Sequence, residues 1–199
     1  DQTTFTLENG EISTCKAVGI GTKGGGLHLN GKNVTFTMTN GVIESNEAEY
    51  LGGGIYTESG GTIYAGKIIN NKSTCETGYG GGIYVDKEAT LQLYNTLIRN
   101  NTATALGGGI WACRTGDVKI YVTEGGAVYD NNTIGEFTIS VPNKGAGDDI
   151  AVYVQGGILG PLLGDGYLKL SPSMLGGGAN HYYKDGGVTG FNNATHAHN

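Results

Sequence analysis

The chain has 199 residues, of which 38 are glycine and only three are proline. Glycine therefore makes up about 19% of the chain, against about 7% in an average protein, which excludes an ordinary helical domain because each helical glycine costs roughly 1 kcal/mol relative to alanine. The net charge is −6 and no cluster of lysine and arginine occurs, so we expect no nucleic acid or anionic membrane as a partner.

The first recurring element begins at Gly10 and places an aliphatic residue three positions before a polar one. Its aliphatic column contains Ile12, Ile43, Ile68, Ile98 and Val128, and its polar column contains Asn46, Asn71, Asn101 and Asn131. We expect the asparagines to form a structural ladder at a corner of the chain, in the left-handed backbone conformation and bonded to one another. Cys15 takes the first place in this column, where we expect a buried thiol.

The second element is a glycine triplet followed by a short apolar strand. It reads GGGLHL from Gly24, GGGIYT from Gly52, GGGIYV from Gly80 and GGGIWA from Gly107, at intervals of about 28 residues, and a looser copy begins at Gly145. Glycine directly before a strand fits a corner that requires a positive φ or a close approach of two backbones.

The third element alternates with a period of two, as in TFTMT from Thr35 and TLQLY from Thr90, which is typical of a half-buried strand. Three short strands in about 28 residues, without any helical period, predict an all-β parallel β-helix (solenoid) of roughly six to seven coils.

We expect coils over 1–155, a terminal coil and cap over 156–190 and a tail over 191–199. The chain opens within a repeat, so we expect a fragment of a longer protein. Cys15, Cys75 and Cys113 stand in different columns, which predicts no disulfide.

Aromatic residues follow the inward positions of the glycine-triplet strand and should therefore face outward, one per coil. They are His28, Tyr56, Tyr84 and Trp111, with Tyr64, Tyr94 and Tyr121 on the neighbouring sheet. Rings in such a column can bind a sugar or a protein, or they can stabilise the coil by stacking on one another. The sequence leaves both interpretations open.

Parallel β-helices also host enzymes that act on polysaccharides, and such enzymes require acidic or basic residues close together. Asp148 and Asp149 resemble a paired-aspartate element, but adjacent strand residues face opposite ways, which favours a corner cap or a bound cation. Arg114, Asp117 and Lys119 could form a lyase-like patch, although chance proximity explains them better. His196 and His198 fall in the tail. We therefore expect no catalytic residue, no metal site and no cofactor.

The pairing of GGGI(Y/W) with G-x-I-x-x-N from Gly10 to Gly109 resembles the polymorphic-outer-membrane-protein-type repeats and related adhesin-like surface proteins. Their motifs are GGA(I/L/V) and FxxN; here glycine replaces the alanine, and isoleucine or valine replaces the phenylalanine. The resemblance implies a right-handed β-helix in a secreted, surface-attached protein of adhesion.

From this resemblance we expect a non-catalytic, monomeric rod segment in an extracellular protein that is attached to the cell through parts outside this chain. Its lateral face would bind a protein or glycan of a host or neighbouring cell, with His28, Tyr56, Tyr84 and Trp111 as candidate ligand-binding residues. No run of roughly 18 apolar residues predicts a membrane span. The alternative is a β-helix polysaccharide lyase or glycoside hydrolase.

Overall fold

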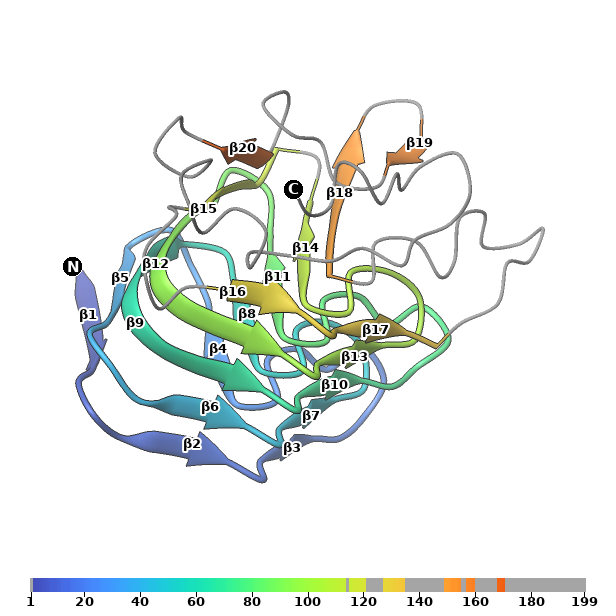
Figure 1. Ribbon diagram of the computed structural model, residues 1–199, viewed down its shortest axis with the longest axis horizontal. Helices are drawn as coiled ribbons and strands as arrows, with labels where there is room; N and C mark the ends of the chain where they lie inside the picture. Colours follow the sequence, from blue (N-terminus) through green and yellow to red (C-terminus); the bar gives the residue numbers. More distant parts are fainter. Residues whose placement is uncertain are drawn as a thin grey trace.

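The computed structural model is a parallel β-solenoid in which each coil contributes strands to three sheets (Figure 1). The structure describes residues 2–113, 115–120, 127–134, 149–154, 157–159 and 168–170. These described residues contain no helix and close about four turns. The predicted parallel β-helix is thus confirmed, while the predicted six to seven coils exceed what the described residues form. The cap over 156–190 lies outside them except for two short strands, and the tail over 191–199 lies outside them entirely.

The first sheet, which we call the long sheet, runs along one side of the coil stack. Its two longest strands have ten residues each, because the predicted middle strand and the strand of the asparagine motif join into one bent strand. The pairing is parallel, with Ile63 opposite Leu93 and Ile68 opposite Ile98. The strands are β1 (Thr3–Leu7), β2 (Glu11–Ser13), β5 (Val34–Met38), β6 (Val42–Glu44), β9 (Gly60–Ile69), β12 (Thr90–Arg99), β15 (Asp117–Ile120), β16 (Ala127–Tyr129) and β20 (Leu168–Leu170).

The second sheet, the short sheet, follows the asparagine corner and has strands of only two residues. It is absent from the sequence prediction, because two residues cannot show a period. Its strands are β3 (Lys16–Ala17), β7 (Glu47–Ala48), β10 (Lys72–Ser73), β13 (Thr102–Ala103) and β17 (Asn132–Thr133).

The third sheet, the glycine sheet, is formed by the strands that follow the glycine triplets. Its parallel strands are β4 (Leu27–Leu29), β8 (Ile55–Thr57), β11 (Ile83–Val85), β14 (Ile110–Ala112) and β18 (Ile150–Val154), and β19 (Gly157–Leu159) pairs with β18 in the antiparallel direction. The first glycine of each triplet has a positive φ of 64° or 65°. A Cβ on the second would meet backbone: on Gly53 it would lie 2.4 Å from the carbonyl oxygen of Gly81. Both reasons predicted for glycine therefore apply, to different residues of the triplet.

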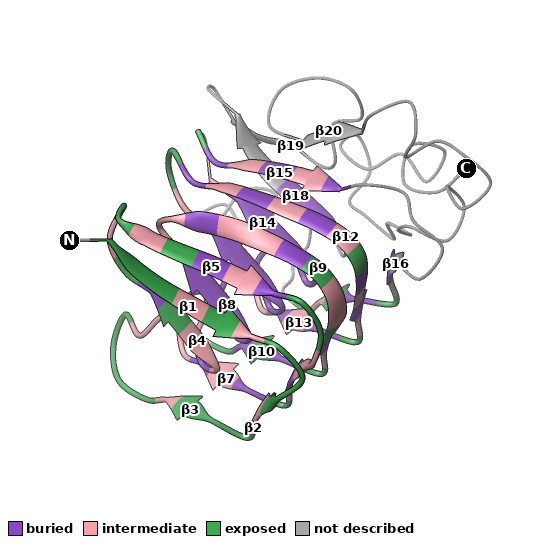
Figure 2. Cartoon of the chain, turned by 90° about the vertical axis from the view of Figure 1, so that its left-hand side faces the viewer, coloured by how far each residue is buried: buried purple, intermediate pink, exposed green. Residues whose placement is uncertain are grey.

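The principal core fills the inside of the coils, between the long sheet and the glycine sheet (Figure 2). Alternation in the sequence predicts most of its members, because successive side chains of a strand point to opposite faces. Ala65, which the alternation places inside, instead lines a hollow on the outer face, because the strand bends there. Burying them supplies the main stabilisation, at roughly 25 cal/mol per Å² of apolar surface. The residues predicted to point inward on the glycine-triplet and alternating strands that are buried include Phe36, Met38, Ile55, Ile63, Ile83, Leu91, Leu93, Ile110, Val118 and Ile120. The aliphatic column of the asparagine motif adds Ile43, Ile68, Ile98 and Val128 to this core.

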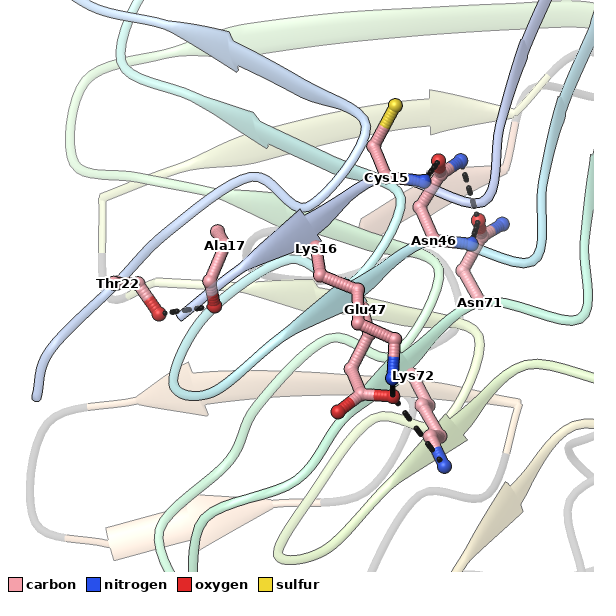
Figure 3. A network of polar contacts seen from close by, with 8 residues as sticks. All are labelled: Cys15, Lys16, Ala17, Thr22, Asn46, Glu47, Asn71 and Lys72. Atoms are coloured by element: carbon pink, nitrogen blue, oxygen red, sulfur yellow. Dashed lines mark hydrogen bonds and ion pairs between the residues drawn. The ribbon is translucent and has the colours of Figure 1, made fainter. Parts of the chain in front are cut away.

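Two predictions at the asparagine corner need correction. The left-handed residues are the ones directly before the asparagine column, namely Thr14, Ser45, Asn70, Asn100 and Asp130, with φ between 55° and 57°. The column residues themselves instead turn their side chains into the corner. Cys15 is exposed rather than buried, because it belongs to the first coil and has a neighbouring coil on one side only (Figure 3). The predicted absence of disulfides is confirmed, since Cys15, Cys75 and Cys113 are all free.

Candidate functional site

The aromatic column is aligned as predicted but is not an open surface. His28, Tyr56, Tyr84 and Trp111 occupy equivalent positions of β4, β8, β11 and β14. The side chain of His28 is exposed, whereas Tyr56, Tyr84 and Trp111 are 0%, 8% and 4% exposed. The prediction that these three rings face solvent is therefore wrong.

A second, smaller core explains this burial. The segment before the second, third and fourth glycine triplets turns back over the outer face of the glycine sheet and packs an apolar residue on it. Leu51, Tyr79 and Leu106 are these residues, and Tyr79 stacks on Trp111 with ring centroids 5.0 Å apart. The signal was present in the sequence, because an apolar residue directly precedes the second, third and fourth triplets. Lys23 takes this place in the first coil.

The hydroxyl of Tyr56 is the centre of a charged network at the edge of this second core. Lys23 Nζ donates to Tyr56 Oη at 2.8 Å and lies 4.4 Å from the ring centroid. The hydroxyl donates to the carboxylates of Glu58, at 3.1 Å, and of Asp86. Burial, together with these two carboxylates, raises the pKa of Tyr56 far above its usual value near 10.

The two carboxylates of this network also accept backbone hydrogen bonds. Gly31 N donates to Glu58 Oε2 at 3.2 Å, and Lys87 N donates to Asp86 Oδ1 at 2.7 Å. Their oxygens are thus occupied by protein donors. A phenol held protonated is a poor base, so we interpret the network as a structural element that satisfies a polar group at the edge of a core.

The predicted asparagine ladder is confirmed by its hydrogen bonds, and Figure 3 shows its first two members, Asn46 and Asn71. Asn46 Nδ2 donates to Asn71 Oδ1 at 3.0 Å, and the same bond joins Asn71 to Asn101 and Asn101 to Asn131. Each of these acceptor oxygens also takes the backbone N–H of the preceding ladder residue, and each Nδ2 also donates to a carbonyl oxygen one coil back, such as that of Ile12 or Ile43. The four amides are 0–6% exposed.

Asp149 is the last member of the ladder among the described residues, which favours one of the predicted alternatives. Its carboxylate is buried, and Oδ1 accepts from both N and Nδ2 of Asn131, each at 2.9 Å. Asp149 therefore caps the corner, while Asp148 lies outside the described residues. Of the proposed lyase-like patch, Arg114 is also outside them, and Lys119 forms an ion pair with Asp117 at 3.9 Å.

An open feature of the described residues lies elsewhere, on the outer face of the long sheet. A shallow hollow of about 530 Å³ crosses the places where β1 and β5 end, β2 and β6 begin, and β9 and β12 bend. Its floor is low because glycine or alanine occupies the bend in most coils. The lining residues are Asn9, Gly10, Glu11, Asn40, Gly41, Val42, Ala65, Gly66, Lys67, Asn95 and Leu97.

Two stacked tyrosines neighbour lining residues of this hollow in the chain, although neither tyrosine lines it. Tyr64 and Tyr94 directly precede the lining residues Ala65 and Asn95, and their ring centroids are 5.5 Å apart at an interplanar angle of 18°. Tyr64 is 52% exposed, so this pair forms the open aromatic face that we expected on the glycine sheet. Met38 of the preceding coil pairs with Ile63, so the next residue, Thr39, takes the position equivalent to Tyr64. The preceding coil therefore has no ring at this position.

Asparagine side chains supply hydrogen-bonding groups to the hollow. Asn40 Nδ2 donates to Asn9 Oδ1 at 3.1 Å, and both side chains are exposed. The other polar atoms, Asn9 Nδ2 and Asn40 Oδ1, bond to none of the described residues. The sequence prediction missed these residues, although a signal existed: asparagine precedes the glycine of the motif in the first two repeats.

Comparisons with known proteins identify no family, so the assignment of a function depends on the geometry of the site. No protein-family model matches the chain, and no curated protein and no solved structure is found to be similar to it. Within the described ranges, no three histidine, cysteine, aspartate or glutamate side chains lie close enough together to hold a metal ion. The same ranges contain no helix with the length and hydropathy needed to span a bilayer.

Proposed function

We propose that this chain is a non-catalytic segment of a secreted, adhesin-like cell-surface protein, and that it binds a glycan on the outer face of its long sheet. The observation that carries this proposal is the stack of the exposed Tyr64 on Tyr94, directly before the residues Ala65 and Asn95 that line the hollow. The repeats that resemble adhesin-like surface proteins support the broader assignment. The proposed location is extracellular, with attachment to the cell through parts outside this chain.

The chemistry of the hollow suits a sugar. Tyrosine rings present a flat apolar face on which the C–H groups of a pyranose can pack, and the face of Tyr64 toward the Thr39 coil meets no stacked ring. Carboxamides offer both a donor and an acceptor, which matches the vicinal hydroxyls of a sugar. Asn9 Nδ2 and Asn40 Oδ1 supply one such donor and one such acceptor, and neither atom bonds to a described residue.

The charge of the hollow narrows the ligand class. Glu11 and Lys67 are its two charged lining residues, and their charges cancel. A neutral oligosaccharide therefore fits better than a polyuronic acid, which would require an excess of positive charge. We expect the oligosaccharide to lie along the coil axis, because the carboxamides of Asn9 and Asn40 follow one another from coil to coil.

Binding to a panel of neutral and acidic oligosaccharides tests the proposal. Tyr64→Ala with Tyr94→Ala should weaken binding of the best neutral oligosaccharide at least roughly tenfold, because two aromatic contacts are lost. His28→Ala is the matched control, since His28 is an exposed ring on the glycine sheet. Loss of binding in His28→Ala, with unchanged binding in the tyrosine variant, would move the site to the glycine sheet and overturn this assignment.

The same panel separates the proposal from the enzymatic alternative. A binding segment releases its oligosaccharide unchanged, whereas a lyase or hydrolase shortens it. The carboxylates of Glu58 and Asp86 lie close together, because both accept a hydrogen bond from Tyr56. Neither residue lines the hollow. Shortened products that disappear in Glu58→Gln would favour the enzyme and refute the non-catalytic function.

A further inference from the structure

The fold places a glycine after an exposed asparagine at the floor of the hollow. Asn9 precedes Gly10 and Asn40 precedes Gly41. Gly41 has a φ of 122°, and a Cβ on it would lie 2.5 Å from the carbonyl oxygen of Gly10 in the neighbouring coil. A Cβ on Gly66, the equivalent in the next coil, would lie 2.7 Å from the carbonyl oxygen of Gly41. Coil stacking therefore favours glycine at positions 41 and 66, whereas Thr96 stands opposite Gly66 in the following coil.

An asparagine followed by glycine is chemically labile. The backbone nitrogen of the next residue can attack the side-chain Cγ, and glycine offers the least steric hindrance to that attack. A bond forms between this nitrogen and Cγ, the Cγ–Nδ2 bond breaks, and ammonia leaves with the proton of the backbone amide. Water then opens the resulting cyclic imide at either carbonyl, which gives aspartate or isoaspartate.

The attacking nitrogens of the hollow are unprotected. Among the hydrogen bonds of the described residues, neither Gly10 N nor Gly41 N serves as a donor. Both asparagine side chains are exposed, so water reaches the imide. We propose that Asn9 and Asn40 are sites of spontaneous deamidation, at which the hollow slowly changes from a neutral to an acidic surface.

Two other asparagines of the chain serve as internal controls. Asn30 is exposed and precedes Gly31, but Gly31 N donates to the carboxylate of Glu58 at 3.2 Å, and this bond must break before the nitrogen can attack. Asn95 belongs to the hollow, but it precedes the buried, β-branched Thr96. Since a hydrogen bond to a charged group is strong, Asn30 should react roughly tenfold more slowly than Asn40.

The modification has a consequence that rests on the proposed function. Deamidation of Asn40 removes the donor of the bond between Asn40 and Asn9, and it places a carboxylate beside the hydroxyl-binding groups of the hollow. When both sites have reacted, two carboxylates face each other. We therefore expect the neutral oligosaccharide to bind more weakly to aged protein.

Peptide mapping by mass spectrometry on the folded chain, aged in mildly alkaline buffer, tests the proposal without any ligand. Peptides with Asn9 and Asn40 should gain aspartate and isoaspartate first, and those with Asn30 and Asn95 should lag. In denaturant, Asn30 should become as fast as Asn40. Equal rates at Asn30 and Asn40 in the folded chain, or no reaction at Asn9 and Asn40, would overturn the proposal.

Variants separate this chemistry from the glycan assignment. Asn9→Gln with Asn40→Gln should stop the modification at these sites, whereas Asn30→Gln should leave their rates unchanged. If deamidation occurs as expected but neither fresh nor aged protein binds an oligosaccharide, the modification stands and the proposed glycan site fails. If the glycan binds and the two asparagines persist through ageing, the reverse holds.

Discussion

At the scale of single residues, the asparagine ladder shows why one residue type recurs at one corner. Each carboxamide both accepts from the preceding ladder residue and donates to the following one, so that a chain of bonds runs along the stack. Aspartate can accept but, when ionised, cannot donate. This difference explains why Asp149 stands at the end of the ladder and Asn71 within it.

The ladder predicts that replacing an asparagine by aspartate within it costs more stability than replacing Asp149 by asparagine. Asn71→Asp should destabilise the fold by about 3 kcal/mol, because a buried carboxylate oxygen would face the carbonyl of Ile43 and Oδ1 of Asn101. Asp149→Asn keeps the acceptor for Asn131 and should change stability by less than about 1 kcal/mol. Urea unfolding of both variants measures the difference, and equal losses would contradict this account of the ladder.

At the scale of elements, the sequence predicts the strands whose pattern repeats and misses those that are too short to show one. The glycine-sheet strands and the two halves of the long strands appear as columns, because equivalent residues pair in register from coil to coil. The two-residue strands of the short sheet carry no period. The predicted burial of the Cys15 thiol is wrong for a related reason. Its column predicts a corner, but burial at that corner depends on coils on both sides.

The glycine triplets predict a difference between two kinds of glycine. Gly53→Ala should cost at least about 3 kcal/mol, because the new Cβ would meet the backbone of Gly81 and of Lys72 at 2.4 Å and neither can move without shifting a coil. Gly31→Ala, at a φ of 94° with open space around it, should cost about 1 kcal/mol. Thermal unfolding compares the variants. A similar cost at both positions would show that backbone conformation, and not coil stacking, selects these glycines.

At the scale of the whole molecule, the described part of the solenoid has two cores, and the sequence predicts only the inner one. Alternation separates the two faces of a strand, but it cannot show whether another segment covers the outer face. Leu51, Tyr79 and Leu106 provide that cover on the glycine sheet, which turns a predicted binding surface into an interior. On the long sheet, the exposed Tyr64 stays available for recognition. The location of the candidate site therefore depends on which column of outward side chains is left uncovered by other segments.

The second core makes the stability of the whole chain sensitive to alkaline pH. Burial is the main cause that raises the pKa of Tyr56, Tyr79 and Tyr84 above the value near 10 of an unfolded chain. The stabilisation from these neutral phenols is therefore complete below about pH 10 and is lost as the pH rises above it. Each buried phenol that ionises only on unfolding lowers the unfolding free energy by about 1.4 kcal/mol per pH unit.

This alkaline loss can be assigned to the second core by one substitution and two simultaneous signals. Tyr84→Phe should flatten the fall of the unfolding free energy above about pH 10 by roughly 1.4 kcal/mol per pH unit. In the parent chain, part of the phenolate absorbance should appear only when the β-sheet signal in circular dichroism disappears, because the buried phenols cannot ionise before the coils open. Complete and reversible phenolate formation with an unchanged β-sheet signal would show that these rings are accessible in the folded chain.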